Sequence, residues 1–179
     1  IPHEWVESVK KCVADIASNF TTNRMLIDYE DRFYKKLAAR KRELSADAYR
    51  LAREIAAWKR KVSAAWDQVR VADVQRVKID KEAVCVGEKY RFSVTVDIAN
   101  LRPEDIGVEM VIARQIVGGQ SVNVTRTIRL EHVRTDNNLV TYALDYTPNE
   151  AGTFDVALRI FPSNPHLPHR MDFALVKWA

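Results

Sequence analysis

Apolar residues in the first part of the chain recur every three or four positions. The stripes run from Trp5 to Phe20, from Met25 to Leu37 and from Leu51 to Trp66. This spacing places one apolar stripe along a helix. Helix start signals precede the stripes at Pro2, at Thr21–Asn23 and at Ser45. The pattern predicts about three helices over residues 1–68.

The period changes to two in the second part of the chain. From Tyr90 to Ile98, every even position is apolar and every odd position is polar. Strict alternation is typical of an antiparallel strand with one buried face. Similar runs lie within Val69–Ile79, Ile106–Ile112, Val122–Leu130, Val140–Tyr146, Phe154–Ile160 and Phe173–Trp178. About seven strands predict an antiparallel β-sandwich, and with the helices an α+β chain.

The segment Tyr146–Val156 favours an immunoglobulin-like (Ig-like) topology. Its spacing of turn residues and apolar residues is typical of the turn that enters the sixth strand of such a sandwich. Phe154 stands where the corner tyrosine would be, and Val156 where the second disulfide cysteine would be. Since neither the hydroxyl nor the disulfide is available, we expect an Ig-like sandwich packed by aliphatic side chains.

Composition changes where the periodicity changes. All five glycines follow residue 86, and residues 69–179 hold equal numbers of acidic and basic residues. The net charge of +4 therefore lies entirely in residues 1–68. We predict two domains, a helical segment 1–68 and an Ig-like sandwich 69–179. With 47% hydrophobic and 29% charged residues, the whole chain has a globular composition.

Several classes of protein are disfavoured by the sequence. The longest uncharged stretch, Gln115–Thr125, is too short and polar to span a bilayer, so no membrane partner is expected. Cys12 and Cys85 form no CxxC motif, which favours a reduced, cytoplasmic setting. The chain begins with Ile1 rather than Met, and we expect it to be a piece of a longer protein.

Two groups of residues suggest ligands but have plainer interpretations. His166 and His169 could be half of a metal site, yet they flank prolines in a loop typical of a rigid crossover, and no metal is predicted. The basic run Lys35–Arg42 could meet phosphate groups. It also lies near a predicted helix C-terminus, where cations are favourable, and no nucleic-acid motif accompanies it. We therefore expect no nucleic-acid partner.

Aromatic residues provide the candidates for sugar contact. Trp58 and Trp66 share an apolar helical stripe, so we expect them in the core rather than on a sugar platform. Most aromatic residues of the sandwich fall on the positions of their strands that should face the core, and only Phe161 and Trp178 do not. Two rings at strand ends make a poor platform unless the fold brings them together. We therefore expect any α-glucan affinity to be weak, about millimolar or poorer.

The sequence contains no recognisable catalytic constellation. The GxSxG, Walker, HExxH and GxGxxG motifs are all absent. We therefore assign no catalytic, cofactor-binding or metal-binding residue to this chain.

Two segments nevertheless resemble a known family. Ser18–Tyr34 resembles the end of the catalytic core of α-glucan phosphorylases, the glycogen and maltodextrin phosphorylase group. The matching features are a helix ending in a small residue and Phe20, a capped turn before Arg24, and an aromatic helix with Tyr29. Leu158–Trp178 resembles the C-terminal extension of the bacterial members, through Leu-Arg-Ile, Asn-Pro, Leu-Pro-His and Val-Lys-Trp.

The resemblance implies a parent glycosyltransferase in carbohydrate metabolism. Such a parent carries pyridoxal phosphate and splits α-1,4-glucan with phosphate to release glucose 1-phosphate. The family's cofactor lysine lies in a Gly-Thr-x-Asn-Met-Lys type motif that this chain lacks. The resemblance therefore implies no cofactor and no activity in this chain alone. It also implies a missing catalytic lobe as partner, so that Trp5, Phe20, Tyr29 and Phe33 should be exposed.

Two functions remain open at this point. The chain is either a non-catalytic C-terminal portion of an α-glucan phosphorylase, whose sandwich serves scaffolding, oligomerisation or weak glucan contact, or an independent module with a helical arm and an Ig-like domain that binds protein or carbohydrate. The sequence sets no oligomeric state. The gene upstream of Ile1 discriminates between the two.

Overall fold

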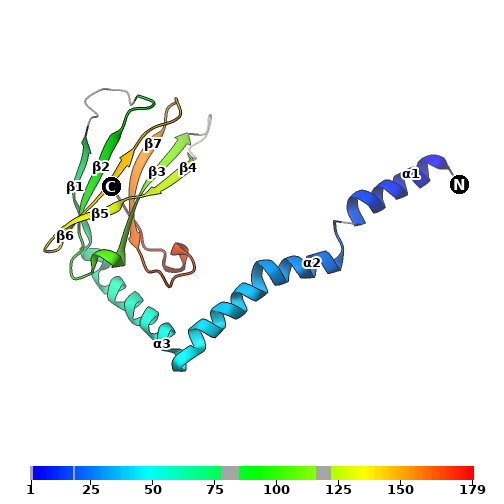
Figure 1. Ribbon diagram of the computed structural model, residues 1–179, viewed down its shortest axis with the longest axis horizontal. Coiled ribbons are helices and arrows are strands. Elements are labelled where there is room, and N and C mark those ends of the chain that lie inside the picture. The colour runs from blue at the N-terminus through cyan, green and yellow to red at the C-terminus, as the bar shows by residue number, and fades with distance from the viewer. Residues whose placement is uncertain (1, 18, 78–84, 116–121) are drawn as a thin grey trace. The chain divides into compact units, whose positions relative to one another are not determined.

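The computed structural model describes residues 2–17, 19–77, 85–115 and 122–179. The chain divides into two compact units, Ile1–Ala56 and Ala57–Ala179 (Figure 1). The second unit includes the last turns of a helix as well as all the strands. The domain boundary predicted at residue 68 therefore falls within this unit.

The first unit is helical. Helix α1 (His3–Cys12) passes into a π-helical stretch, η1 (Val13–Ala17). After a turn come α2 (Thr22–Tyr29), a second π-helical stretch, η2 (Glu30–Tyr34), and the beginning of α3 (Lys35–Ala65). The Thr21 hydroxyl accepts a hydrogen bond from the backbone N–H of Arg24 at 3.2 Å. This N-cap satisfies a donor that the first turn leaves free, and confirms the helix start predicted there.

The predicted count of three helices differs from the structure. The helix expected over Met25–Leu37 runs through α2 and η2 into the beginning of α3, and the helix expected from Ser45 lies in the second part of α3. Within α3 the backbone is non-helical at Ala46, and φ is positive at Asp47, Ala48 and Tyr49 (50°, 50° and 62°). Positive φ is costly for residues that carry a Cβ. The start signal at Ser45 therefore lies at a kink, where one helical stretch of α3 ends and another begins.

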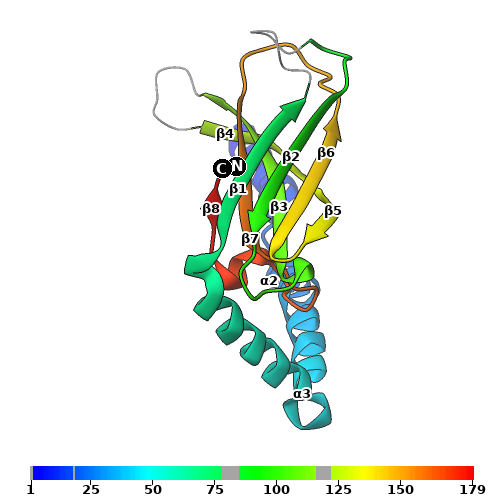
Figure 2. The ribbon, with the colours of Figure 1, turned by 90° about the vertical axis from the view of Figure 1, so that its left-hand side faces the viewer.

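The second unit contains two antiparallel four-stranded sheets. The strands are β1 (Arg70–Val77), β2 (Tyr90–Asp97), β3 (Ile106–Gln115), β4 (Val122–Arg129), β5 (Glu131–Asp136), β6 (Leu139–Tyr146), β7 (Asp155–Pro162) and β8 (Lys177–Trp178). One sheet has the order β1-β2-β6-β5, whose strands lie side by side in Figure 2. The other has the order β4-β3-β7-β8.

The core between the sheets confirms the alternation seen in the sequence. All the even positions from Tyr90 to Ile98 are buried, with Val96 completely inaccessible. Their partners from the other sheet include Val108, Met110 and Ile160. The last turns of α3 add Trp58, Val62, Ala65 and Trp66 to the same cluster. Both tryptophans are therefore core residues, as their helical spacing predicted.

The strands differ from the expected set in two places. The described residues form eight strands where about seven were predicted, because β5 was not expected. The last strand is shortened to Lys177–Trp178, since a 3₁₀ turn, η5 (Arg170–Phe173), occupies its predicted beginning. The first strand matches β1 at Arg70–Val77, and the end of its predicted range, Ile79, lies outside the described residues.

Register shifts interrupt three of the strand pairs. They occur between Val71 and Asp73 of β1, between His132 and Arg134 of β5, and where β4 skips a residue opposite Ile112 and Ala113. Each is an extra residue that bends the strand locally. The remaining pairings, including β3 with β7, run without interruption.

Candidate functional site

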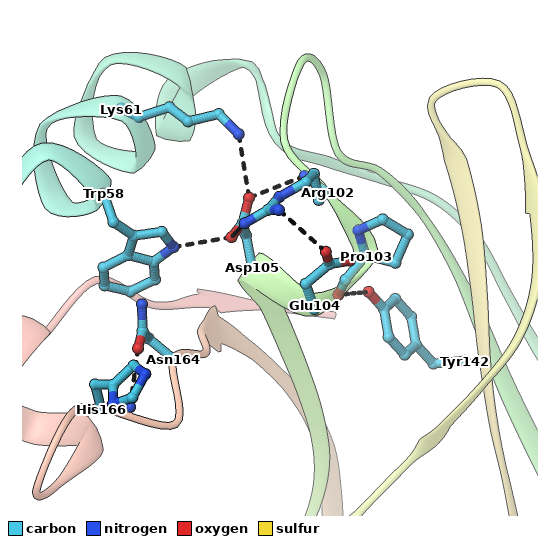
Figure 3. A network of polar contacts seen from close by, with 9 residues as sticks. All are labelled: Trp58, Lys61, Arg102, Pro103, Glu104, Asp105, Tyr142, Asn164 and His166. Atoms are coloured by element: carbon cyan, nitrogen blue, oxygen red, sulfur yellow. Dashed lines mark hydrogen bonds and ion pairs between the residues drawn. The ribbon is translucent and has the colours of Figure 1, made fainter. Parts of the chain in front are cut away.

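A buried carboxylate, Asp105, joins α3 to the sandwich. It ends the 3₁₀ turn η4 (Pro103–Asp105) and is 2% exposed. Its Oδ1 accepts a hydrogen bond from Trp58 Nε1 at 2.9 Å, and its Oδ2 accepts one from the Arg102 backbone N–H at 3.0 Å (Figure 3). Lys61 Nζ forms an ion pair with Oδ2 at 3.3 Å. The Asp105 carbonyl also accepts from the Ser163 N–H at 2.8 Å.

The balance of these contacts keeps Asp105 ionised. Burial acts to raise its pKa, but the hydrogen bonds from Arg102, Trp58 and Lys61 outweigh burial and lower the pKa below its usual value. Protein donors serve both carboxylate oxygens, so the group is suited to fixing structure rather than to proton transfer. Asp105 therefore has a structural role at the junction of α3 and the sandwich.

The polar network continues to the sheet β1-β2-β6-β5, through Tyr142 of β6, and to the proline-rich loop. The Tyr142 hydroxyl donates to the Pro103 carbonyl at 3.0 Å, and burial raises the pKa of this phenol. In the loop after β7, the His166 backbone N–H donates to Asn164 Oδ1 at 2.9 Å (Figure 3). These contacts fix the loop and keep Tyr142 as a neutral donor.

The more promising surface lies on the outer side of the sheet β4-β3-β7-β8. Glu109 of β3 is paired in register with Arg159 of β7, and Arg159 is paired with Trp178 of β8. Residues paired across strands share a face, and core residues such as Leu158 and Ile160 occupy the opposite one. The three side chains therefore form a row directed away from the core.

A carboxylate and two guanidinium groups form the centre of this surface. Glu109 is 5% exposed, although it lies on the side of the sheet that faces away from the core. Its Oε1 accepts from Arg159 Nε at 2.6 Å and from Arg170 Nη1 at 2.6 Å, and Arg159 Nη2 also bonds to it. Charge-assisted bonds of this kind are short and directional. They hold both guanidinium groups in place over the sheet.

Two aromatic rings flank the guanidinium groups. The Arg159 guanidinium carbon lies 5.5 Å from the centre of the Trp178 ring, and that of Arg170 lies 5.8 Å from the centre of the Phe161 ring. Both distances are in the range of cation–π contacts. Phe161 lies over Gly107, where an added Cβ would come within 2.7 Å of the ring. We call Glu109, Arg159, Phe161, Arg170 and Trp178 the aromatic–arginine face.

The sandwich also has two cavities among its described residues. The larger, about 520 Å³, opens between the sheets and is lined mainly by apolar groups such as Phe92, Met110 and Phe154. The smaller, about 350 Å³, lies beside Tyr142 and His132. Among the residues that the structure describes, neither lining includes a lysine, whereas pyridoxal phosphate is bound through a lysine Schiff base. The residues of these cavities therefore do not fit that cofactor.

The histidines singled out in the sequence are not brought into a metal site. His166 and His169 both lie exposed in the loop before η5. Among the residues that the structure describes, no three His, Cys, Asp or Glu side chains converge as a metal site would need.

The basic run of α3 is accompanied by acidic neighbours. Lys35 Nζ lies 2.7 Å from Asp31 Oδ1, and Arg40 Nη1 lies 2.7 Å from Glu43 Oε2. These exposed ion pairs are typical of a solvated helix surface. Across the described segments, no helix is both long enough and apolar enough to cross a membrane.

The aromatic residues expected to be exposed on the helices are exposed. Trp5 and Phe20 have 61% and 75% of their surface accessible, and Tyr29 and Phe33 about half. Other large apolar residues of this unit share the exposure: Val9, Val13, Ile16, Met25, Leu26, Ile27 and Leu37. Single exposed apolar residues are common, but so many on one helical unit form an apolar surface larger than monomeric proteins usually expose.

Comparison with known sequences decides the family. Residues 66–179 match the family described as the glycogen phosphorylase C-terminal domain, which is more than half of the chain. The chain belongs to this family. The match includes Trp66, the whole sandwich and the aromatic–arginine face.

Relatives of the glycogen phosphorylase C-terminal domain family extend the similarity over the helices. The chain is 29% identical over 178 residues to maltodextrin phosphorylase of Thermococcus litoralis, an alignment that covers 97% of this chain and 20% of that protein. It is 27% identical over 180 residues to glycogen phosphorylase of Mycobacterium tuberculosis and to that of Mycobacterium bovis, covering all of this chain and 21% of each relative. The chain therefore spans about a fifth of the length of these relatives.

Sequence reasoning missed the polar members of the aromatic–arginine face. It singled out Phe161 and Trp178 because they break the aromatic parity of their strands. It gave no reason to single out Glu109, Arg159 or Arg170 as members of a site. A charged residue at the centre of an otherwise apolar strand, as at Glu109 in Ile106–Ile112, is the signal that could have drawn attention to this surface.

Proposed function

We propose that this chain is a non-catalytic C-terminal portion of an α-glucan phosphorylase. Its parent would bind pyridoxal phosphate outside these residues and split α-1,4-glucan with phosphate to glucose 1-phosphate in the cytoplasm. The observation that carries the proposal is the family match over residues 66–179, joined to relatives that align with the entire chain over only a fifth of their own length.

Scaffolding is the role that the helices support best. The exposed apolar residues of unit Ile1–Ala56 would be costly to leave in water, at about 25 cal/mol per Å² of apolar surface. Contact with the catalytic part of the parent would bury them. The sandwich would then be held at the end of the enzyme, where it is available for oligomerisation or for weak glucan contact.

An Ig-like topology is part of this proposal. The strand orders β1-β2-β6-β5 and β4-β3-β7-β8 correspond to the ABED and CFG sheets of Ig-like domains, with β4 as an additional strand beside β3. Phe154 is half-buried against the core, at the position where such domains have their corner tyrosine. The core is otherwise dominated by aliphatic side chains, as expected from the missing disulfide.

The proposal is tested by separating the chain from the catalytic part of the parent. Residues 1–179 alone should release no glucose 1-phosphate from maltodextrin and show no pyridoxal absorbance. Mixed with the separately expressed catalytic part, they should form a complex that is detectable by analytical ultracentrifugation. Phe33→Asp should weaken the complex. Val133→Asp is the control, because Val133 on β5 is about as exposed as Phe33, and this variant should leave the complex intact.

Two results would contradict this assignment. Release of glucose 1-phosphate by the chain alone would show that it is catalytic. A start codon immediately before Ile1, with no upstream frame that encodes the lysine motif, would favour the independent interaction module instead.

A further inference from the structure

We propose that the aromatic–arginine face binds a short segment of α-1,4-glucan. Trp178 would stack on the apolar face of one glucose unit, and Arg159 and Arg170 would donate hydrogen bonds to hydroxyl groups. The choice of an α-linked chain rests on the proposed function. That the ligand is a neutral sugar chain rests on the chemistry of the face itself.

The fold satisfies the condition that the sequence left open. Phe161 and Trp178 lie on neighbouring strands, β7 and β8, and both side chains point away from the core. Trp178 is paired in register with Arg159, two positions from Phe161. Diagonal neighbours of this kind lie about 7–8 Å apart, within reach of one ligand. The two rings are therefore parts of one surface rather than isolated strand ends.

The exposure of Trp178 suits a stacking contact. Trp178 is 55% exposed, although Arg159 lies against its ring. A guanidinium group can cover only one of the two faces of an indole, so the remaining exposure includes apolar ring surface. An aromatic ring presents such a surface with a polar handle at its rim. This combination matches a pyranose, which has apolar C–H faces and a rim of hydroxyls.

The buried ion pairs of Glu109 should contribute little to the stability of the fold. A buried ion pair gains little, because desolvation of the charges offsets their attraction. On an outward-facing position of the sheet, a polar neutral side chain would suffice. What Glu109 does is orient two guanidinium groups beside two rings. Holding ligand-binding groups in place before the ligand arrives reduces the entropic cost of binding.

Donors remain available for a ligand after this orientation. In the part of the chain that the structure describes, the Arg159 guanidinium donates from Nε and Nη2, and both bonds go to Glu109. Its Nη1 is left for a hydroxyl acceptor. The adjacent carboxylate already neutralises one guanidinium, and an anion would leave both rings unused. A neutral polyhydroxylated ligand uses the rings and the donors together.

The test uses the indole N–H signals of the four tryptophans in the ¹⁵N-labelled chain 1–179, titrated with maltoheptaose. We expect the Trp178 signal to shift with a dissociation constant of about 1 mM. Trp58, whose N–H is bonded to Asp105, and Trp66, which is buried, should not respond. Trp5, exposed on α1, should not respond either and reports on nonspecific contact.

Two variants examine the rings separately. Trp178→Ala should weaken binding at least about tenfold, a difference of roughly 1.4 kcal/mol, whereas the matched change Trp5→Ala should leave it unchanged. Gly107→Ala keeps every residue of the face but pushes the Phe161 ring off the sheet, and should weaken binding while circular dichroism stays unchanged. Gly107→Ala is the second variant if Trp178→Ala disturbs β8.

Three outcomes would overturn the proposal. The first is no shift of the Trp178 signal at maltoheptaose concentrations about tenfold above millimolar. The second is a larger shift with inorganic phosphate than with maltoheptaose, which would make the face an anion site. The third is equal binding of cellohexaose, which would remove the preference for α-linked glucan. None of these titrations involves the catalytic part, so their failure is distinct from failure of the scaffolding role.

Discussion

The indole N–H of Trp58 donates to the carboxylate of Asp105 across 47 positions of the sequence. Both residues are buried, Trp58 on α3 and Asp105 at the end of η4, directly before β3. A buried donor is expensive to leave without an acceptor, so this single bond fixes which residue of α3 lies over η4. It makes the last turns of the helix a part of the sandwich.

The loss of this acceptor should destabilise the sandwich. Asp105→Ala leaves the buried Trp58 N–H without its acceptor, which should cost about 1–3 kcal/mol, and also removes the acceptor of the Arg102 backbone N–H. Urea unfolding followed by tryptophan fluorescence measures the difference. Glu104→Ala is the matched control, because Glu104 is exposed and its ion pair with Arg102 at 3.5 Å should contribute less than about 1 kcal/mol. Equal losses in the two variants would contradict the role given to Asp105.

The contribution of Asp105 should disappear in acid. Its pKa in the folded state is below its ordinary value of 3.8, so the unfolded chain takes up the proton first as the pH falls. The stabilisation is fully present above about pH 4 and is lost as the pH falls through the folded-state pKa. The free-energy difference between the wild type and Asp105→Asn should therefore be constant from about pH 5 to 8 and shrink below about pH 4.

The strands were predictable where one face is buried and the other is wet. From Tyr90 to Ile98 the alternation alone identified the buried face. The strand β5 was missed because all its residues are exposed, and Val133 is its only apolar residue. No alternation can appear in a strand without a buried face. The start signal at Ser45 and Asp47 lies at the kink of α3, where the second of its two helical stretches begins.

Removal of the helical turns that precede the strands should weaken the sandwich. A chain of residues 57–179 keeps Trp58, Val62 and Trp66 in the core, whereas residues 69–179 lack all three. We expect 57–179 to unfold cooperatively and 69–179 to melt at a markedly lower temperature or to lose its near-UV circular dichroism. Calorimetry of the two fragments measures this. If both fragments melt at the same temperature, the helix contributes nothing to the core.

Two valines on helices should respond differently to the same change. Val62 is fully buried in the sandwich core, while Val9 of α1 is 42% exposed. Val62→Ala should cost about 2 kcal/mol, because it removes apolar contact and leaves a cavity. Val9→Ala should stay within about 0.5 kcal/mol in this chain. Guanidinium unfolding followed at the fluorescence of the buried tryptophans compares the two variants.

The sequence singled out the two aromatic residues of the candidate site but not the charged residues between them. Parity within one strand shows that Phe161 and Trp178 differ from the other aromatic residues. Whether two such residues meet depends on the register between strands, which the sequence of one strand does not contain. Arg170 is further removed, since it comes from η5 rather than from a strand. Only the folded chain brings it to Glu109.

The register shifts in the edge strands limit how the sheets can associate with other molecules. The outermost strands of the two sheets are β1 and β5 in one, and β4 and β8 in the other. Three of them contain a bulge, and β8 has only two residues. Bulged or very short border strands are poor templates for adding a strand from another molecule, and so they discourage fibre-like aggregation. If the isolated chain self-associates, we expect the contacts to run through the apolar helices and to be reversible, rather than to extend the sheets.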